Sequence, residues 1–352
     1  SEDELSYMIS DSESKIAICS TREKAEMARK IKPGTGLETI IVMESWNGPA
    51  GEGIYHFNEV LETGRKNLDM DGLRRSIQAA RPEDMVSIIY TSGTTGKPKG
   101  AVITHGNWVA AMRQFADPTL LRRAGQDKDL HMTFLVHLPI CHVYGRSADY
   151  HVGGLTLGGV LIFEPDFSLI PKTLREVRPN VIVSIPRFYE KVYDQVNSVI
   201  SRQPATVQKM FAWAVRQGEK FANAMARGRP LDPINMMLFS LANILVFNNL
   251  RKQAGLDRLV MGISGGGKLS KDVCNFIRSL GVQLSEGYGL TETCASLNYN
   301  APEFQGIDRN NLSWFQTKML DWTHYCMIKK QAEGLSPYTS PVRMLMLGLA
   351  YY

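Results

Sequence analysis

The stretch YTSGTTGKPKG, residues 90–100, constrains this chain more than any other. It holds three glycines, four serine or threonine hydroxyls and two lysines in eleven residues. Short apolar, β-branched runs at 85–89 and 101–104 predict a buried strand on each side. Glycine lets a backbone approach a ligand closely, so free N–H groups, hydroxyls and ammonium groups can surround an anion. We therefore expect an anion-binding loop between two strands, and triphosphate is the obvious candidate.

This loop is not of the Walker A type. That type needs Ser or Thr directly after its lysine and a helix beyond. Here Pro98 follows Lys97, and the chain returns into a strand. The alternative is a flexible glycine–serine hairpin tip, but a plain tip does not need so many donors.

Composition limits the partners of the chain. Its 352 residues suffice for one large or two ordinary domains, and 44% hydrophobic with 21% charged residues is typical of a globular protein. The net charge is +5 with scattered basic residues, so we expect no nucleic-acid binding. Anionic ligands or an anionic membrane surface remain open.

Cysteine usage and apolar runs bear on location. The five cysteines form no CxxC pair, which favours a reducing, intracellular compartment. No signal peptide opens the chain, and its first residue, Ser1, is not Met, so we expect residues before it to be missing. The longest apolar run, 234–247, contains Asn235, Ser240 and Asn243, and we expect no transmembrane segment.

The order of elements predicts an α/β fold. A helix at 1–10, a strand at 15–19, a helix capped by Thr21 and ended by Pro33-Gly34, and a strand at 38–43 imply a parallel sheet with helices on its faces. A turn is expected at 153–159, and further strands are expected at 160–163 (buried), 181–185, 258–263 and 282–285. We predict a mostly parallel, doubly wound sheet with flanking helices.

The region 196–250 is expected to be mostly helical. One helix in it is apolar nearly all round, with Met236, Met237, Phe239, Leu241, Leu245, Val246 and Phe247. Core packing is the default for such a helix. A membrane-contacting surface is the alternative.

Two further segments follow predicted strands. In SGGGKL, residues 264–269, the backbone lacks side chains and can lie flat against a planar ring. The segment EGYGLTET, residues 286–293, adds a tyrosine and a carboxylate, and a hard carboxylate together with phosphate oxygens suits Mg²⁺.

These motifs closely resemble the adenylate-forming superfamily, which holds acyl-CoA synthetases, luciferases and peptide-synthetase adenylation domains. The resemblance continues past the loop into Ala101–Asn107, and it covers residues 1–300. It implies part of the large N-terminal adenylation (AMP-binding) domain, with the small C-terminal domain absent. It also implies ATP and Mg²⁺ as cofactors and coenzyme A as co-substrate.

The resemblance assigns site residues to matching positions. For the phosphates it implies Thr91, Ser92, Gly93, Thr94, Thr95, Gly96 and Lys97. For the remaining nucleotide contacts it implies Gly265, Gly266, Gly267, Lys268, Glu286, Gly287, Tyr288, Gly289 and Thr291. Tyr288 would stack on adenine, Thr291 would contact the α-phosphate, and Glu292 with Thr91 would hold Mg²⁺. Gly267 and Lys268 stand where Ala and Pro are more usual, which loosens the loop.

His142 matches a histidine of the family's next motif, LPICHVY. With Lys97, Thr291 and Glu292 it completes the implied catalytic set. A metal cluster of His131, His137, Cys141 and His142 is an alternative, but its ligand spacing is irregular. A plain core histidine is the other alternative.

The segment IPRFYEKVY, residues 185–193, resembles the long-chain branch of the acyl-CoA synthetases. Phe188, Val192 and Val196 share one helix face there, which a packed surface helix also explains. The implied activity is ATP-dependent conversion of a long-chain fatty acid to acyl-adenylate and then acyl-CoA, by a long-chain fatty-acid–CoA ligase. The implied location is the cytoplasm or the periphery of an organelle membrane, the endoplasmic reticulum or the peroxisome in a eukaryote.

No resemblance is recognised beyond residue 300, and residues 301–352 are expected to form an irregular tail, from a truncated or mis-joined gene or a genuine variant segment. Neither the Thr-Gly-Asp that binds ribose nor the C-terminal lysine is found after Glu292. We therefore expect little or no ligase activity from this chain as it stands. The alternatives are an inactive nucleotide- or acyl-binding fragment, a peptide-synthetase adenylation domain and a luciferase-like enzyme.

Overall fold

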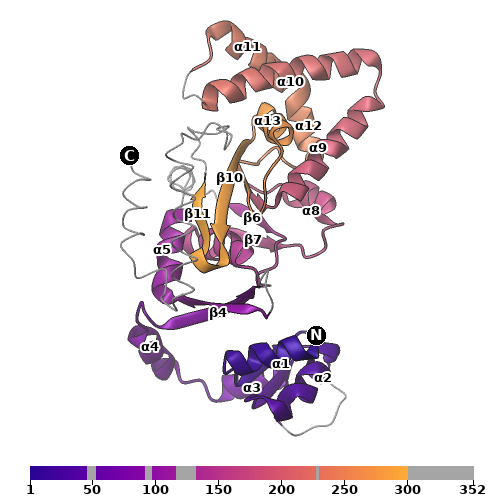
Figure 1. The fold of residues 1–352 in the computed structure, drawn as a ribbon. Coiled ribbons are helices and arrows are strands. Elements are labelled where there is room, and N and C mark those ends of the chain that lie inside the picture. Colours follow the sequence, from indigo (N-terminus) through magenta and orange to yellow (C-terminus); the bar gives the residue numbers. More distant parts are fainter. Residues whose placement is uncertain (46–52, 92–96, 116–131, 227–229, 300–352) are drawn as a thin grey trace. The chain divides into compact units, whose positions relative to one another are not determined.

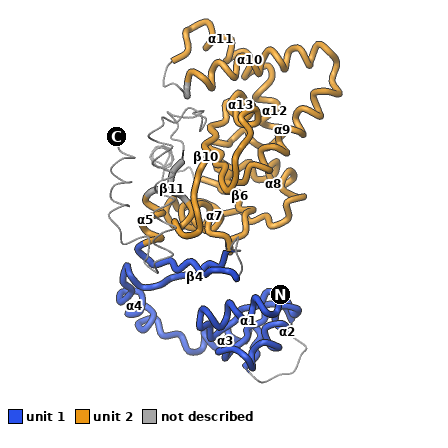
Figure 2. Tube along the Cα trace, in the orientation of Figure 1, with its two compact units in different colours: residues 1–106 blue, residues 107–352 orange. Residues whose placement is uncertain are grey.

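The computed structural model describes residues 1–45, 53–91, 97–115, 132–226 and 230–299 (Figure 1). Two compact units divide the chain, residues 1–106 and residues 107–352 (Figure 2). Each unit is described by itself.

The first unit contains a three-stranded parallel sheet in the order β1 (Ile16–Cys19), β2 (Thr39–Val42), β3 (Ile54–His56). Helix α1 (Glu2–Asp11) and helix α2 (Arg22–Ile31) pack on it around Ile40 and Val42, which are fully buried. The Thr21 hydroxyl accepts a hydrogen bond from the Lys24 amide, as a capping residue does. The predicted strand–helix–strand pattern is confirmed, and Pro33-Gly34 lie in the short 3₁₀ helix η1 (Lys32–Gly34) that ends α2.

Two helices and a hairpin complete this unit. Helices α3 (Phe57–Lys66) and α4 (Met70–Ala79) lead to β4 (Met85–Thr91), which pairs antiparallel with β5 (Lys99–Thr104). Both strands on either side of the 90–100 stretch were predicted. The predicted burial was wrong at Met85, Val86 and Val102, which are exposed, because a sheet of only two strands covers little of its own surface.

A six-stranded sheet forms the second unit, in the order β11-β10-β9-β8-β6-β7. These strands are β6 (Thr133–Val136), β7 (Val160–Phe163), β8 (Val181–Ser184), β9 (Met261–Ser264), β10 (Gln283–Leu290) and β11 (Ala295–Tyr299). All neighbours are parallel except β10 and β11. The buried strand predicted at 160–163 is a strand, but Val160 and Phe163 are exposed because β7 lies at the sheet edge.

Helices cover both faces of this sheet, as the predicted doubly wound fold requires. On one face, α8 (Ile170–Val177), α9 (Pro186–Ser201) and α13 (Lys271–Ser279) pack over Leu135, Ile182 and Leu284. Successive side chains of a strand point to opposite faces, so Phe134, next to Leu135 in β6, lies on the other face of the sheet. Helix α5 (His105–Phe115) and the short helix α7 (Val143–Gly145) precede the segment that packs there.

That segment is a π-helix, η2 (Arg146–Thr156). The expected turn at 153–159 is therefore wrong in its first half, and only residues 157–159 leave the helix. Packing explains the glycine: a Cβ atom at Gly153 would stand 2.9 Å from Cδ1 of Phe134. Gly153 serves a close approach of helix and sheet.

Strand β8 leads into α9. Four further helical segments then connect α9 to β9: α10 (Ala205–Ala226), α11 (Pro233–Ala242), the π-helical η3 (Asn243–Phe247) and α12 (Asn248–Ala254). The helical prediction for 196–250 is confirmed. The core-packing expectation for the apolar helix is only half right, because its residues divide between a buried and an exposed side. By length and composition, Pro233–Ala254 could cross a bilayer, a property that buried helices of other proteins share.

Candidate nucleotide site

A row of polar side chains follows the carboxyl ends of β6, β8 and β9 and the end of the segment of β10 that pairs with β9. Ser184 of β8 stands in register with Ser264 of β9, and Ser264 with Glu286 of β10. His137 follows β6, and its Nε2 atom lies 2.8 Å from Oγ of Ser184. Ligands of open α/β sheets bind beyond the carboxyl ends of strands, so this edge is the place for a site.

The glycine segment after β9 is anchored at both of its ends. The Gly265 amide donates to the Ser184 carbonyl at 3.0 Å, and the Leu269 amide donates to Oε1 of Glu286 at 3.3 Å. Between these anchors Gly266, Gly267 and Lys268 are exposed. Gly266 has φ +75°, a conformation that favours glycine. The loop therefore presents bare backbone, which suits contact with a flat ring.

The ring of Tyr144 packs against the first glycine of this loop, Gly265. A Cβ atom at Gly265 would stand 2.8 Å from Cζ of the Tyr144 ring. The Tyr144 hydroxyl lies 3.3 Å from the Ser184 carbonyl and 3.4 Å from that of Ile263, and burial raises the pKa of this tyrosine well above its ordinary value. Sequence reasoning missed Tyr144. Its place two residues after His142 was the available signal.

His142 is exposed and caps α7, because its Nδ1 accepts a hydrogen bond of 3.2 Å from the Tyr144 amide. Its implied catalytic role stays a prediction. Among the described residues no three His, Cys, Asp or Glu side chains gather closely enough to hold a metal. His131, a member of the alternative metal cluster, lies outside them.

The second motif lies partly within a strand rather than after one. Strand β10 continues through Leu290, so Glu286, Gly287, Tyr288 and Gly289 are strand residues, with Tyr288 half-buried and paired to Asn298. Thr291 and Glu292 follow in the 3₁₀ turn η4 (Thr291–Thr293) and are half-buried. The Thr293 hydroxyl, which accepts from the Leu290 amide at 3.0 Å, closes the turn.

The π-helix contacts this turn and carries a buried acid. Ser147 donates from Oγ to the Cys294 carbonyl at 3.1 Å. Two residues on, Asp149 is fully buried, and neither carboxyl oxygen has a hydrogen-bond partner among the described residues. Burial raises the pKa of Asp149 well above its ordinary value, because an environment without water disfavours the charged form. No sequence pattern pointed to it.

The phosphate-loop residues belong to the first unit. Thr91 ends β4 and is half-buried, while Lys97 is exposed with Nζ 5.0 Å from the centroid of the Tyr7 ring. Ser92, Gly93, Thr94, Thr95 and Gly96 lie outside the described residues. The expected meeting of this loop with the glycine segment at one edge stays a prediction.

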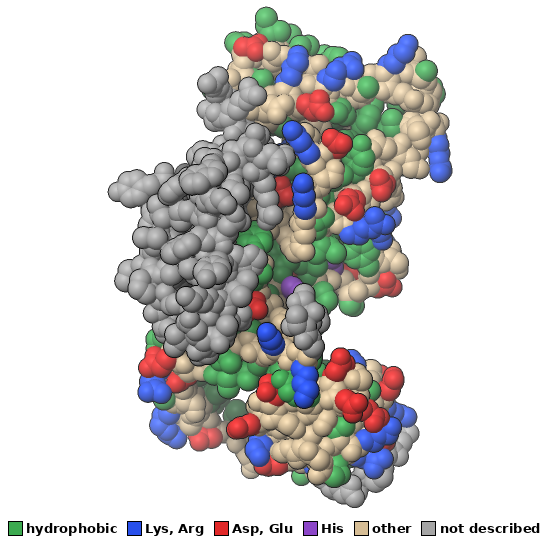
Figure 3. All heavy atoms as spheres, viewed as in Figure 1, with side chains coloured by type: hydrophobic (Ala, Val, Ile, Leu, Met, Phe, Trp, Pro, Cys, Tyr) green, Lys and Arg blue, Asp and Glu red, His purple; other side chains and the backbone are tan. Residues whose placement is uncertain are grey.

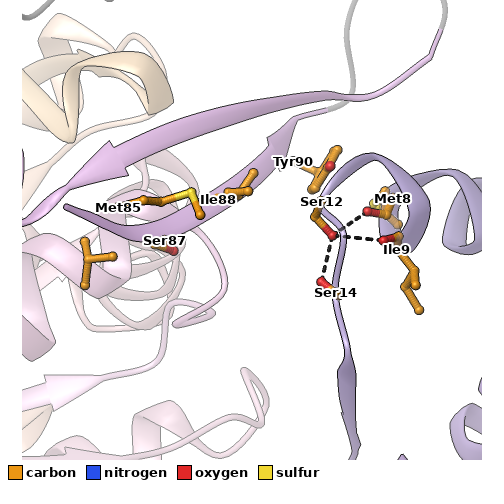
Figure 4. Close-up of a pocket in the computed structure, with 9 residues that line it drawn as sticks. Met8, Ile9, Ser12, Ser14, Met85, Ser87, Ile88 and Tyr90 are labelled. Atoms are coloured by element: carbon orange, nitrogen blue, oxygen red, sulfur yellow. Dashed lines mark hydrogen bonds between the residues drawn. The ribbon is translucent and has the colours of Figure 1, made fainter. Parts of the chain in front are cut away.

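Just before the loop, Tyr90 is tied to α1. Its hydroxyl donates to Oδ2 of Asp11 at 2.6 Å, and burial is the main cause that raises its pKa to about 12. A pocket with a volume of about 450 Å³ adjoins this contact (Figure 4). Its lining comes from the end of α1, the segment after it and β4, and contains none of the predicted site residues: Met8, Ile9, Ser12, Ser14, Met85, Val86, Ser87, Ile88 and Tyr90.

Comparison with known proteins gives the family. The model of the AMP-binding enzyme family matches residues 1–325. A long-chain-fatty-acid–CoA ligase of Gallus gallus is 31% identical over 252 residues, covering 71% of this chain and 32% of the relative. Another, of Mycobacterium bovis, is 30% identical over 298 residues, covering 83% of this chain and 46% of the relative. The chain thus spans between a third and a half of the length of these relatives.

Solved structures of adenylate-forming enzymes share the fold. The anthranilate CoA ligase AuaEII in complex with anthranoyl-AMP superposes with a TM-score of 0.53 at 19% identity, covering 86% of this chain and 46% of that one. The adenylation domain of the carboxylic acid reductase of Segniliparus rugosus, in complex with AMP, gives a TM-score of 0.50 at 18% identity, covering 85% and 44%. The similarity to these two structures shows the fold, and the match to the family model shows the family. The chain belongs to the AMP-binding enzyme family, and its resemblance to long-chain-fatty-acid–CoA ligases and to adenylate-forming enzymes is confirmed.

Proposed function

We propose that the protein of which this chain is part activates long-chain fatty acids, first to acyl-adenylate and then to acyl-CoA. The observation that carries the proposal is the segment Gly266–Lys268, held at both ends and bare of side chains in its two glycines, at the carboxyl edge of a parallel sheet. The names of the relatives supply the acid, a long-chain fatty acid, and the acceptor, coenzyme A.

In the proposed first step the fatty carboxylate attacks the α-phosphorus of ATP, and pyrophosphate leaves. In the second step the thiol of coenzyme A attacks the acyl carbonyl, and AMP leaves. The substrates supply both nucleophiles, so the protein acts by positioning and by offsetting charge. The exposed backbone at Gly266 and Gly267 would receive adenine beside Tyr288, while Thr291 and Lys97 would contact phosphate oxygens.

Mg²⁺ fits the donors that this proposal assigns. Glu292 offers a half-buried carboxylate and Thr91 a hydroxyl, both hard oxygen ligands. Bound there, Mg²⁺ would neutralise charge on the phosphate oxygens. Glu286 would also fix the loop, because its Oε1 atom accepts a hydrogen bond from the Leu269 amide.

The specificity is tested by binding, which does not require turnover. Residues 1–352 are titrated calorimetrically with non-hydrolysable adenylate analogues carrying palmitoyl, acetyl or aminoacyl groups. We expect the palmitoyl analogue to bind most tightly. Preference for the aminoacyl analogue would instead favour a peptide-synthetase domain, and no binding of any analogue would overturn the assignment of the site.

Turnover is measured separately with ATP, Mg²⁺, palmitate and coenzyme A. We expect residues 1–352 to form little or no palmitoyl-CoA, because the ribose carboxylate and the C-terminal lysine of the family are not found in them. Losing a positioned charge of this kind costs on the order of a hundredfold in rate. A rate equal to that of a full-length relative would contradict this expectation.

We place the protein inside the cell, in the cytoplasm or at the periphery of an organelle membrane. One relative, from Arabidopsis thaliana, is named as a peroxisomal long-chain acyl-CoA synthetase, with 30% identity over 254 residues. Fractionation of cells that express the tagged chain tests this location, and secretion of the chain would contradict it.

A further inference from the structure

Helix α1 has one side in the core of the first unit and another side that meets the hairpin of β4 and β5. Ile9 is buried in that core, and Leu5 packs against it. Tyr7 and Asp11 are four residues apart, so they share one face of the helix. Each is two residues from Ile9, which at about 3.6 residues per turn places both on the opposite side. The core therefore fixes where Tyr7 and Asp11 lie.

Tyr90 joins the end of β4 to this face of α1. Its hydroxyl donates to Oδ2 of Asp11 at 2.6 Å, and its ring stands edge-on to the Tyr7 ring with centroids 6.5 Å apart. Gly100 of β5 lies opposite Tyr90, and a Cβ atom there would stand 3.1 Å from Cζ of the Tyr90 ring. The glycine thus leaves room for the tyrosine ring between the hairpin and the helix.

Lys97, on the other side of residues 92–96, meets the same helix face. Its Nζ atom lies 5.0 Å from the centroid of the Tyr7 ring, inside the range of about 6 Å for a cation–π contact. Lys97 is exposed, and it forms no ion pair with any residue that the structure describes. An aromatic ring attracts a cation through its quadrupole rather than through a net charge. Tyr7 therefore holds the ammonium group and leaves its charge available to an anion.

The first unit as a whole does not attract anions. Residues 1–106 contain 13 Lys and Arg against 16 Asp and Glu, a net charge of −3. Figure 3 shows side chains of both signs on the visible face of this unit. Within 85–104, Lys97 and Lys99 are the only charged residues. Binding of an anion at this segment thus depends on where these two ammonium groups are held.

From these contacts we infer that Tyr7 is a positioning residue that holds the Lys97 ammonium group ready for an oligophosphate. A long side chain that is already ordered loses less conformational entropy when it binds a ligand. The hydrogen bond between Tyr90 and Asp11 supports Tyr7, because it fixes α1 against β4. The inference rests on the proposed function, in which Lys97 contacts the phosphates of ATP. It requires neither adenine nor an acyl group.

The test uses inorganic tripolyphosphate as the probe, because it resembles the phosphates of ATP and lacks adenine. Residues 1–352 are titrated calorimetrically in a chelator, so that no Mg²⁺ takes part. Tyr7→Leu should weaken binding about two- to fivefold, the factor expected of an exposed cation–π contact. Tyr7→Phe keeps the ring and should restore the parent affinity. The control Tyr55→Leu removes an exposed ring of β3 in the same unit and should change nothing.

A double-mutant cycle shows whether Tyr7 acts through Lys97. Lys97→Met should weaken binding of tripolyphosphate at least as much as Tyr7→Leu does. In the Lys97→Met background, Tyr7→Leu should cause no further loss, because the interaction that it removes is already gone. Tyr90→Phe, which leaves Tyr7 intact and loses the hydrogen bond to Asp11, is the second variant and should likewise weaken binding only where Lys97 is present.

Three results would overturn the inference: no binding of tripolyphosphate by the parent chain, unchanged affinity in Lys97→Met, or equal losses from Tyr7→Leu with and without Lys97. Tighter binding by Tyr7→Leu would also overturn it, since the ring would then withhold Lys97 from the anion. Failure of the proposed function looks different. In that case the chain binds tripolyphosphate with the expected effects of the variants but binds no acyl-adenylate analogue, and the inference stands.

Discussion

Gly265 and Tyr144 lie in direct contact: a Cβ atom on the glycine would stand 2.8 Å from the nearest ring carbon of the tyrosine. The contact joins the start of the glycine segment to a ring that is itself buried near the carbonyls of Ser184 and Ile263. The path of the loop thus depends on a residue 121 positions earlier in the chain.

Gly265→Ala should destabilise the fold and weaken AMP binding. The added methyl group forces the Tyr144 ring or the loop to move, and such overpacking costs about 1–3 kcal/mol. Gly267→Ala is the matched control for stability alone, because its Cβ atom would stand at an ordinary 3.5 Å from Cγ of Pro186. Urea unfolding and calorimetry measure both effects. Equal losses of unfolding stability in the two variants would show that the Tyr144 contact is not the cause.

Glu286→Ala should loosen one end of the glycine segment, whereas Glu286→Gln should not. The Ala variant removes the acceptor of the Leu269 amide, and a hydrogen bond of this kind contributes about 0.5–1.5 kcal/mol. Gln keeps an oxygen in the same place. Faster hydrogen exchange at the Leu269 amide in the Ala variant alone is the expected signal, together with weaker AMP binding. Unchanged exchange in both variants would remove Glu286 from this role.

Asp149→Asn should raise the stability at pH 7, with the gain shrinking toward pH 4. Burial raises the pKa of Asp149 in the folded state. As pH rises above about 3.9, the ordinary value, the unfolded chain releases this proton while the folded chain keeps it, so stability is lost. The loss is about 1.4 kcal/mol per pH unit until the folded carboxyl ionises. Asn does not titrate and escapes this loss. Urea midpoints across pH 4 to 8 measure it, and a gain that does not vary with pH would contradict the explanation.

Asp257 provides a comparison of opposite sign. Arg178 donates from Nε to its Oδ1 atom at 2.9 Å, and this hydrogen bond lowers the pKa of Asp257. Its contribution to stability is present above the unfolded pKa and is lost as pH falls through the folded one. Asp257→Asn should therefore be less stable than the parent at pH 7, and the deficit should shrink in acid. A gain in stability at pH 7 would be inconsistent with this ion pair.

Glu292→Ala should weaken ATP binding only when Mg²⁺ is present. The proposed role of the carboxylate is to hold the metal, so with a chelator the parent and the variant should bind ATP equally. Calorimetry in Mg²⁺ and in chelator separates the two cases. Unchanged affinity in Mg²⁺ would remove Glu292 from the metal site.

Local patterns predicted most elements of the fold. The run Val181–Ile185 is apolar and β-branched, and the residues of β8 within it are buried on both sides, as such a run indicates. Phe188, Val192 and Val196 share a helix face, and they pack into the core as that spacing predicts. Both signals lie within a few residues, so no knowledge of the tertiary structure was needed.

Contacts between residues far apart in the sequence determine the features that local patterns did not predict. The sequence of α11 is apolar on all sides, so it does not reveal which side faces the core. In the structure, Phe239 stacks on Phe221, and this contact determines the buried side. Gly153 was expected in a turn, but it lies in a helix that packs against the Phe134 ring. A side chain at this position would collide with that ring. His137 meets Ser184 across 47 positions, because strand order, which is not written in either segment, brings them together.

Neighbouring strands β8 and β9 are joined by residues 185–260, a connection of 76 residues that contains α9 to α12. Closing a long flexible loop costs about 0.6 kcal/mol for each doubling of its length, so the equilibrium penalty is modest. The kinetic effect is larger, since pairings distant in sequence slow folding. We expect helices α9 to α12 to form early from local contacts, which would shorten the path between the two strands before they meet. Refolding should thus be biphasic, with helical circular dichroism recovering before the glycine segment gains its anchor on β8.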